Sequence, residues 1–338
     1  MAKNATDFPL FFRMICVSIA ILSLYCYNDR ITKQTEPERG FTNMKILKKT
    51  GSILFCLLPV LLAFGIQIIV SFAAVILKLI LAIASDPQFL DHMTDPNRII
   101  DVIMDSQFLA AISAVYAVIA AFALGFWYWK RFVPKKQPRR ALSSILNLKT
   151  LAGLVLLMIA MQYLSTYLMA LLAAINPAWY QTYDDLMKNI GFGNVTPLLA
   201  LYSILIAPIS EELIFRGVTL KYATKAMPFF AANLLQAFLF GAFHGNVIQG
   251  AYAFVVGIFC GYVCFQGKSI YLSILFHMLF NLWGTFAPEY FSYSGDSIWI
   301  HLAIFAAAVL ATTAGVFLYH SGTKARTPMP EAYQKYAS

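Results

Sequence analysis

Charged residues are scarce in this sequence. Only 12% of its 338 residues are Asp, Glu, Lys or Arg, whereas 60% are hydrophobic and the mean hydropathy is +0.69. A soluble domain carries about 25% charged residues, so this composition excludes an ordinary soluble globule and predicts a membrane protein. The sequence also lacks a nucleotide-binding loop, zinc-finger spacing, heptads and a fixed-period repeat.

Cysteine is also rare. The five cysteines all lie in apolar stretches: Cys16, Cys26, Cys56, Cys260 and Cys264. This placement predicts small buried thiols and argues against a disulfide framework. Cys260 and Cys264 share a helix face at i,i+4, but no histidine lies near them in the sequence, so zinc binding there is not favoured.

Long apolar runs are abundant instead, and runs of about 20 residues mark membrane-spanning helices. The predicted spans are Phe8–Tyr27, Gly51–Ala84, Phe108–Trp129, Leu151–Ala174, Thr196–Val218, Phe229–Phe243, Gly250–Phe265, Ile270–Ala287 and Ile298–Tyr319. We therefore predict an all-α fold, a polytopic transmembrane helical bundle of about eight core helices, with or without one additional N-terminal helix.

Residues 1–43 form an apolar segment and linker that allow three interpretations. The run Phe8–Tyr27 fits an extra helix with its N-terminus outside, and it also fits an uncleaved signal-like segment. The third is that translation starts at Met44, because basic residues and then an apolar run follow Met44.

The charges that are present occur in blocks between the apolar runs. Segment 130–149 holds seven basic residues and no acid, whereas segment 85–107 holds five aspartates and one arginine. Basic loops favour the cytoplasm, so we predict that the basic loops and the C-terminus are cytoplasmic. The net charge of +9 then reflects membrane topology. We predict a multi-pass integral membrane protein, in the cell membrane if bacterial, with membrane lipids and no nucleic acid as partners.

Three short motifs place ionisable and amide side chains inside apolar sequence. Charges within a membrane span are costly, so such residues mark a functional site by default. Together they supply carboxylate, guanidinium, imidazole and amide groups. The motif residues are Glu211, Glu212 and Arg216; Phe240 and His244; and His277 and Asn281.

The spacing within the motifs assigns partners. Residues four apart share a helix face, so Glu212 and Arg216 are predicted to form an ion pair. Glu211 points about 100° away around the helix and is left as the free carboxylate. His277 and Asn281 are predicted to reach one common site for the same reason of spacing. Phe240 and His244 repeat this spacing, so Phe240 is predicted to form a wall of the site beside His244.

A carboxylate with two imidazoles supports two related mechanisms. In the first, Glu211 and His244 deprotonate a water that attacks a carbonyl carbon, and His277 and Asn281 donate to the oxyanion. In the second, Glu211, His244 and His277 are ligands of Zn²⁺, which activates the water. The cofactor prediction is therefore none or zinc. The His-Glu-x-x-His signature of zinc proteases is missing.

In these residues the sequence resembles the CPBP family of CAAX-type prenyl proteases and bacteriocin-processing or Abi-type membrane proteins. That family's pattern is Glu-Glu-x-x-x-Arg, then Phe-x-x-x-His, then His-x-x-x-Asn or Asp, and it is matched within Thr196–Asn281. The resemblance places a catalytic region at 191–320, after N-terminal transmembrane helices at 44–190 and before a short cytoplasmic tail at 321–338.

The resemblance also implies an activity. It implies an intramembrane endopeptidase that acts on a membrane-associated protein or peptide, either prenylated or bacteriocin-like. By the same resemblance Glu211 and His244 activate water, and His277 and Asn281 stabilise the oxyanion. The resemblance leaves open whether catalysis depends on a metal ion or on the glutamate without a metal.

Two other functional classes remain at the level of sequence. One is a membrane transporter that uses the buried Glu, His and Arg to bind protons or substrate, although no repeated halves are found. The other is a non-catalytic immunity or scaffold protein. Two further expectations concern packing: His301 is predicted to form a hydrogen bond between helices, and Gly241, Gly245, Gly257 and Gly261 to permit close helix contacts.

Overall fold

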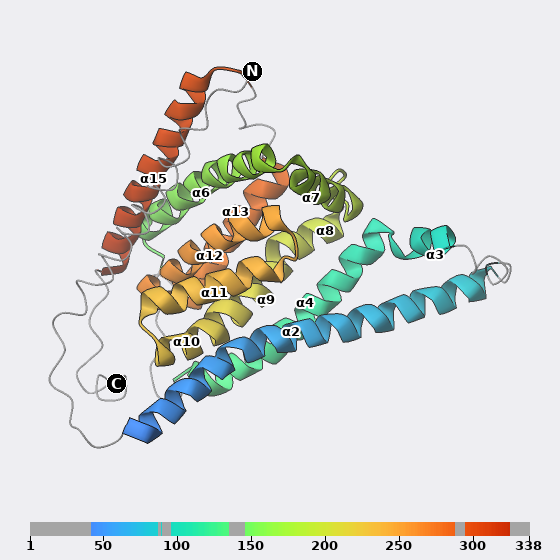
Figure 1. Ribbon diagram of the computed structural model, residues 1–338, viewed down its shortest axis with the longest axis horizontal. Coiled ribbons are helices and arrows are strands. Elements are labelled where there is room, and N and C mark those ends of the chain that lie inside the picture. The colour runs from blue at the N-terminus through green and yellow to red at the C-terminus, as the bar shows by residue number, and fades with distance from the viewer. Residues whose placement is uncertain (1–41, 87–88, 90–95, 135–145, 288–294, 325–338) are drawn as a thin grey trace.

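A computed structural model of the chain describes residues 42–86, 89, 96–134, 146–287 and 295–324 (Figure 1). Helices make up nearly all of this described part, and it contains no strand. The all-α prediction is confirmed. The helices of the first half are α2 (Thr42–Ser85), α3 (Pro96–Ile103), α4 (Ser106–Phe132), α6 (Leu148–Ile175) and α7 (Pro177–Asn189).

The second half begins with one continuous but irregular helix and ends with four regular helices. The irregular helix comprises α8 (Pro197–Leu201), η2 (Tyr202–Ile206), α9 (Ala207–Glu212), η3 (Leu213–Thr219) and α10 (Leu220–Ala226). The regular helices are α11 (Phe229–Phe243), α12 (Val247–Gly267), α13 (Ile270–Phe286) and α15 (Ile298–Lys324).

Six helices in the described part are long and apolar enough to cross a membrane. They are Ile53–Ser85, Ser106–Phe132, Leu148–Ile175, Pro197–Ala226, Val247–Gly267 and Ile298–Thr323. With the shorter apolar helices α11 and α13 they account for the eight predicted core spans, and the chain is a polytopic helical bundle. The predicted span Phe8–Tyr27 lies outside the described residues.

Several helices pack in pairs, and one of these pairs belongs to a central group (Figure 1). Helix α15 lies along α6, α2 lies along α4, and α11 lies along α12. The central group of α9, α11, α12 and α13 carries all three motifs, because each motif falls on one of these helices or directly after it. His301 on α15 joins the α6–α15 pair, since its Nδ1 lies 3.3 Å from the Tyr167 hydroxyl. The predicted interhelical role of His301 is confirmed.

Glycines bring α11 and α12 into backbone contact. A Cβ atom on Gly241 would lie 2.5 Å from the Gly250 carbonyl oxygen, and one on Gly257 would lie 3.2 Å from Ala237 Cα. A Cβ atom on Gly261 would overlap the Asn233 side chain. A Cβ atom at Gly241 or Gly261 would therefore force its neighbours to move, and one at Gly257 would be tightly packed, in agreement with the predicted close helix contacts.

Gly245 has a different role from the one predicted. No atom lies within 4 Å of a Cβ atom built there, but its φ is +71°, in the left-handed region that favours glycine. This residue turns the chain out of α11, and the Asn246 side chain then accepts a hydrogen bond from the backbone N–H of Gln249 at the start of α12. The turn holds His244 at the exit of α11.

Candidate active site

The helix that carries both glutamates is widened on each side of them. Before them, the Ala207 N–H donates to the Tyr202 carbonyl, five residues back. After them, the Leu220 N–H donates to the Phe215 carbonyl, again five residues back. Such π-helical turns are rare and frequently lie at functional sites.

Pro208 accounts for the first wide turn and for one of its contacts. A proline inside a helix has no N–H and its ring clashes with the preceding turn. The Ser203 carbonyl therefore has no donor within the helix. The N–H of Ala207 donates to the Tyr202 carbonyl, and Pro208 has no N–H. The Asn281 Nδ2 fills this gap by donating to the Ser203 carbonyl at 2.8 Å. The third motif is thereby fastened to the helix of the first.

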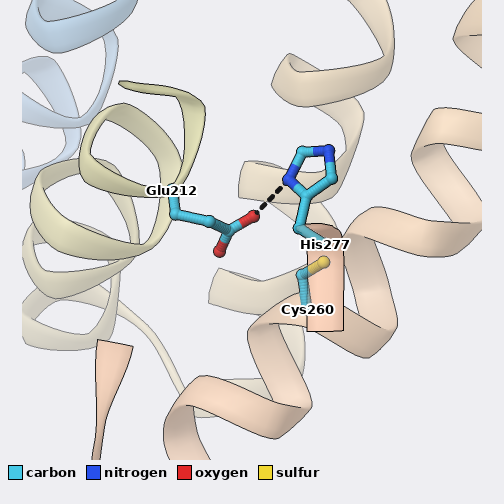
Figure 2. Close-up of side chains that lie close together, drawn as sticks. All are labelled: Glu212, Cys260 and His277. Carbon is cyan, nitrogen blue, oxygen red and sulfur yellow. Dashed lines mark hydrogen bonds and ion pairs between the residues drawn. The ribbon is translucent and has the colours of Figure 1, made fainter. Parts of the chain in front are cut away.

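Glu212 is fully buried and held by three donors. Its Oε1 accepts from Arg216 Nη1 at 2.7 Å and from His277 Nδ1 at 2.9 Å. Its Oε2 accepts from the Ser273 hydroxyl. Figure 2 shows the Glu212 carboxylate directed at the His277 ring, with Cys260 beside them. The predicted Glu212–Arg216 ion pair is confirmed.

Arg216 connects this carboxylate to the α11–α12 pair. Its Nη2 donates to the Gly257 carbonyl at 3.1 Å, and its guanidinium lies 4.5 Å from the centre of the Phe240 ring. Gln236 donates to the same carbonyl at 2.9 Å. The buried guanidinium thus has a carboxylate, a carbonyl and an aromatic face around it, which together offset the cost of burying its charge.

Glu211 differs from its neighbour in accessibility and in partners. Its side chain is 17% exposed, whereas that of Glu212 is 0% exposed. Its Oε2 lies 3.6 Å from His277 Nε2, which is too far for a hydrogen bond and within ion-pair distance when the His277 ring is protonated. Its charge also acts on His244. Glu211 is therefore the carboxylate that a substrate or water can reach.

His244 lies at the end of α11 and is half-buried. Its Nδ1 lies 2.9 Å from the Phe240 carbonyl oxygen. Since a carbonyl only accepts, we assign the proton to Nδ1, and Nε2 keeps a lone pair. The Phe240 ring packs edge to face on both imidazoles, 4.9 Å from His244 and 5.6 Å from His277. Phe240 thus walls the site, as its spacing predicts.

The donor atoms allow a test of the zinc alternative. His244 and His277 both turn Nδ1 to a protein acceptor and leave Nε2 for another ligand, which is the arrangement of most metal-bound histidines. With the Glu211 carboxylate these atoms form a chemically suitable zinc set, although the structure shows close approach only between Glu211 and His277.

A different trio is closer together but chemically unsuited to a cation. Among the described residues, Glu212, Cys260 and His277 have ligand atoms within 4.8 Å of one another (Figure 2). Both oxygens of Glu212 already accept hydrogen bonds, and the Arg216 guanidinium beside them would repel a metal ion. This trio is better described as a hydrogen-bonded cluster.

The structure adds buried polar residues that the motifs do not contain. Ser273 lies four residues before His277 on the same face of α13, so its spacing could have identified it. Asn233 and Gln236 form a hydrogen-bonded pair between α11 and α12. The sequence signal for this pair was the presence of two amide side chains inside the apolar run Phe229–Phe243. Buried polar groups require hydrogen-bond partners, so such amides predict contacts between helices.

Comparison with known proteins adds one finding. The family model described as type II CAAX prenyl endopeptidase Rce1-like matches residues 193–283. This range contains all three motifs, so the match supports the resemblance to CPBP family proteases. Neither the comparison with curated proteins nor that with solved structures finds a match to this chain.

Proposed function

We propose that this chain is an intramembrane endopeptidase that hydrolyses a peptide bond of a membrane-associated substrate, with water activated by Glu211 and His244. The observation that carries the proposal is the contrast between adjacent carboxylates. Glu212 is held by hydrogen bonds from Arg216, Ser273 and His277. Glu211 is accessible, and its Oε2 lies 3.6 Å from His277 Nε2. The family match to residues 193–283 supports the same class of activity.

In the proposed mechanism, two protein acceptors bind and activate the attacking water. Glu211 accepts one hydrogen of the water and the Nε2 of His244 accepts the other. The water oxygen attacks the peptide carbonyl carbon while a proton passes to Glu211. The tetrahedral intermediate then collapses, the C–N bond breaks, and Glu211 returns the proton to the leaving nitrogen. General-base assistance of this kind contributes about 10²–10⁴-fold.

The developing oxyanion requires hydrogen-bond donors. Asn281 can offer the second hydrogen of its Nδ2, since the first is given to Ser203. His277 can offer Nε2 only when its ring is protonated, because we assign the Nδ1 proton to the bond with Glu212. In the zinc alternative, Glu211, His244 and His277 would hold the metal, which would supply a more acidic bound water.

The implied substrates are peptides held at the membrane by a lipid or by their own apolar sequence. We propose cleavage near the C-terminus of a prenylated protein, and a bacteriocin-like peptide is the second candidate that the family resemblance supports. The alternative of a transporter depends on the same buried charges, and it predicts solute movement in place of peptide cleavage.

The test uses the full-length protein in liposomes. The substrates are a fluorogenic farnesylated peptide with three residues after the modified cysteine, its unprenylated counterpart and a hydrophobic bacteriocin-like peptide. Glu211→Gln should lower kcat at least 10³-fold and His244→Ala about 10²-fold. Asp184→Asn, which neutralises an exposed carboxylate on α7, is the matched control and should keep full activity.

The outcomes separate the alternatives. Wild-type turnover in both active-site variants would refute the assignment of Glu211 and His244 as the residues that activate water. A wild-type protein that cleaves nothing, and whose solute flux is blocked by the same substitutions, would favour the transporter. Metal content measured before and after chelation decides the cofactor: activity that survives complete metal removal excludes zinc, and activity restored by added Zn²⁺ requires it.

A further inference from the structure

Tyr116 on α4 has a buried hydroxyl group that finds no hydrogen-bond partner among the described residues. The residue is 7% exposed, and its hydroxyl makes no hydrogen bond within the described part of the chain. A buried hydroxyl without a partner costs stability, so most such groups in native structures are satisfied. An exception calls for an explanation, and a ligand that binds beside the hydroxyl is one.

The surroundings of Tyr116 belong to the candidate active site. Tyr116 forms a small core cluster with Ala117 and Ala120, against which Tyr202, Ile206 and Phe243 pack. Tyr202 and Ile206 are the ends of the wide turn η2, and Phe243 immediately precedes His244.

The carboxylate of Glu211 is also near enough to interact electrostatically with the Tyr116 phenol. Helix α4 packs along α9, which carries that glutamate. Tyr116 therefore approaches the helix of the reacting glutamate from α4, whereas His277 and Asn281 approach it from α13.

The donors assigned to the oxyanion are partly committed to the protein. Asn281 gives one amide hydrogen to Ser203, and His277 gives its Nδ1 hydrogen to Glu212. The neighbouring phenol of Tyr202 is hydrogen-bonded to Ser113. The hydroxyl of Tyr116 is uncommitted, and a donor that needs no reorganisation is what an oxyanion site requires.

We propose that Tyr116 is a further catalytic residue, whose hydroxyl donates a hydrogen bond to the scissile carbonyl oxygen as that oxygen becomes negative. This inference rests on the proposed protease function. No proton is transferred in this role, since the phenol acts as a neutral donor throughout. The hydrogen bond is made only when substrate is bound and is strongest in the transition state, so it should influence kcat more than KM.

The test is Tyr116→Phe in the full-length protein, assayed with the farnesylated peptide. Removing one donor to an oxyanion typically lowers kcat by 10²–10³-fold, and we expect a loss of about 10²-fold with KM within about threefold. A peptide aldehyde, whose hydrate imitates the tetrahedral intermediate, should bind the variant at least about tenfold more weakly, and the corresponding alcohol should bind equally well.

Thermal stability distinguishes this role from a structural one. Tyr116→Phe removes an unpartnered group, so its Tm should equal or exceed that of the wild type. Tyr319→Phe is the matched control: its buried hydroxyl donates to the Val263 carbonyl at 2.7 Å, so Tm should fall and kcat should not change. A Tm loss in Tyr116→Phe that parallels its kcat loss would overturn the catalytic assignment.

The two proposals fail in different ways. If the wild type cleaves the peptide, Glu211→Gln does not, and Tyr116→Phe keeps kcat within about threefold of the wild type, only the role of Tyr116 is wrong. If the wild type cleaves none of the peptides, both proposals are wrong.

Discussion

Replacing Arg216 with methionine should lower the free energy of unfolding by about 3 kcal/mol. Removing one partner of a buried ion pair costs about 3–5 kcal/mol, because the other charge is left uncompensated. The lower end applies here, since Glu212 keeps its bonds from His277 and Ser273. Methionine fills a similar volume beside Phe240, so the loss reflects charge and hydrogen bonding more than a cavity.

A double-mutant cycle isolates the interaction. Adding Glu212→Gln to Arg216→Met removes the uncompensated charge and should recover about 1–2 kcal/mol relative to the sum of the single changes. Reversible unfolding in mixed micelles with increasing SDS measures each variant. Lys221→Met, which removes an exposed cation further along the same helix, is the control and should change stability by no more than about 0.5 kcal/mol.

Two results would refute this reasoning. A coupling energy below about 0.5 kcal/mol would mean that the Glu212–Arg216 contact of 2.7 Å has no net effect on folding. An Arg216→Met variant as stable as the wild type would mean that the guanidinium is not needed to compensate the buried carboxylate.

The remaining predictions concern backbone geometry. Gly241→Ala should destabilise the protein by about 1–3 kcal/mol in the same assay, because its Cβ would lie 2.5 Å from a carbonyl oxygen of α12. Gly65→Ala is the control: no atom lies within 4 Å of a Cβ atom at this position, so the substitution should be neutral or stabilising. Equal effects of the two substitutions would contradict the packing argument. Pro208→Ala restores an N–H that can pair with the Ser203 carbonyl, so Asn281 should be released and kcat should fall about tenfold with KM little changed; unaltered kcat would show that this anchor does not matter to turnover.

Much of the architecture was predictable from composition and run length. The apolar runs predicted eight core spans, and six long helices with α11 and α13 account for them. The i,i+4 rule predicted the ion pair of Glu212 and Arg216 and the wall formed by Phe240. These features depend on residues close together in the chain, for which helical spacing is sufficient information.

Contacts between distant segments were not predictable in the same way. Nothing in helical spacing pairs His277 with Glu212, because their 2.9 Å contact depends on how α13 packs against α9. The assignment of Asn281 and His277 to one oxyanion site stays a prediction, since each is partly held by a protein acceptor. The contact of Asn281 with the first motif's helix had one sequence signal, Pro208. Its missing N–H leaves a helix carbonyl free to accept a hydrogen bond from another helix.

The two helices that position His244 and His277 are short. Helix α11 has 15 residues and α13 has 17, so they are about 22 Å and 26 Å long, against about 30 Å for the hydrocarbon core of a bilayer. Lipids beside such helices adapt to the hydrophobic mismatch by local thinning. We therefore expect His244, which directly follows α11, to lie closer to hydrated headgroups than a residue at the centre of a full-length span would. A hydrolytic enzyme consumes one water for every bond it cleaves, and thinned bilayer at this edge would supply that water without a permanent pore.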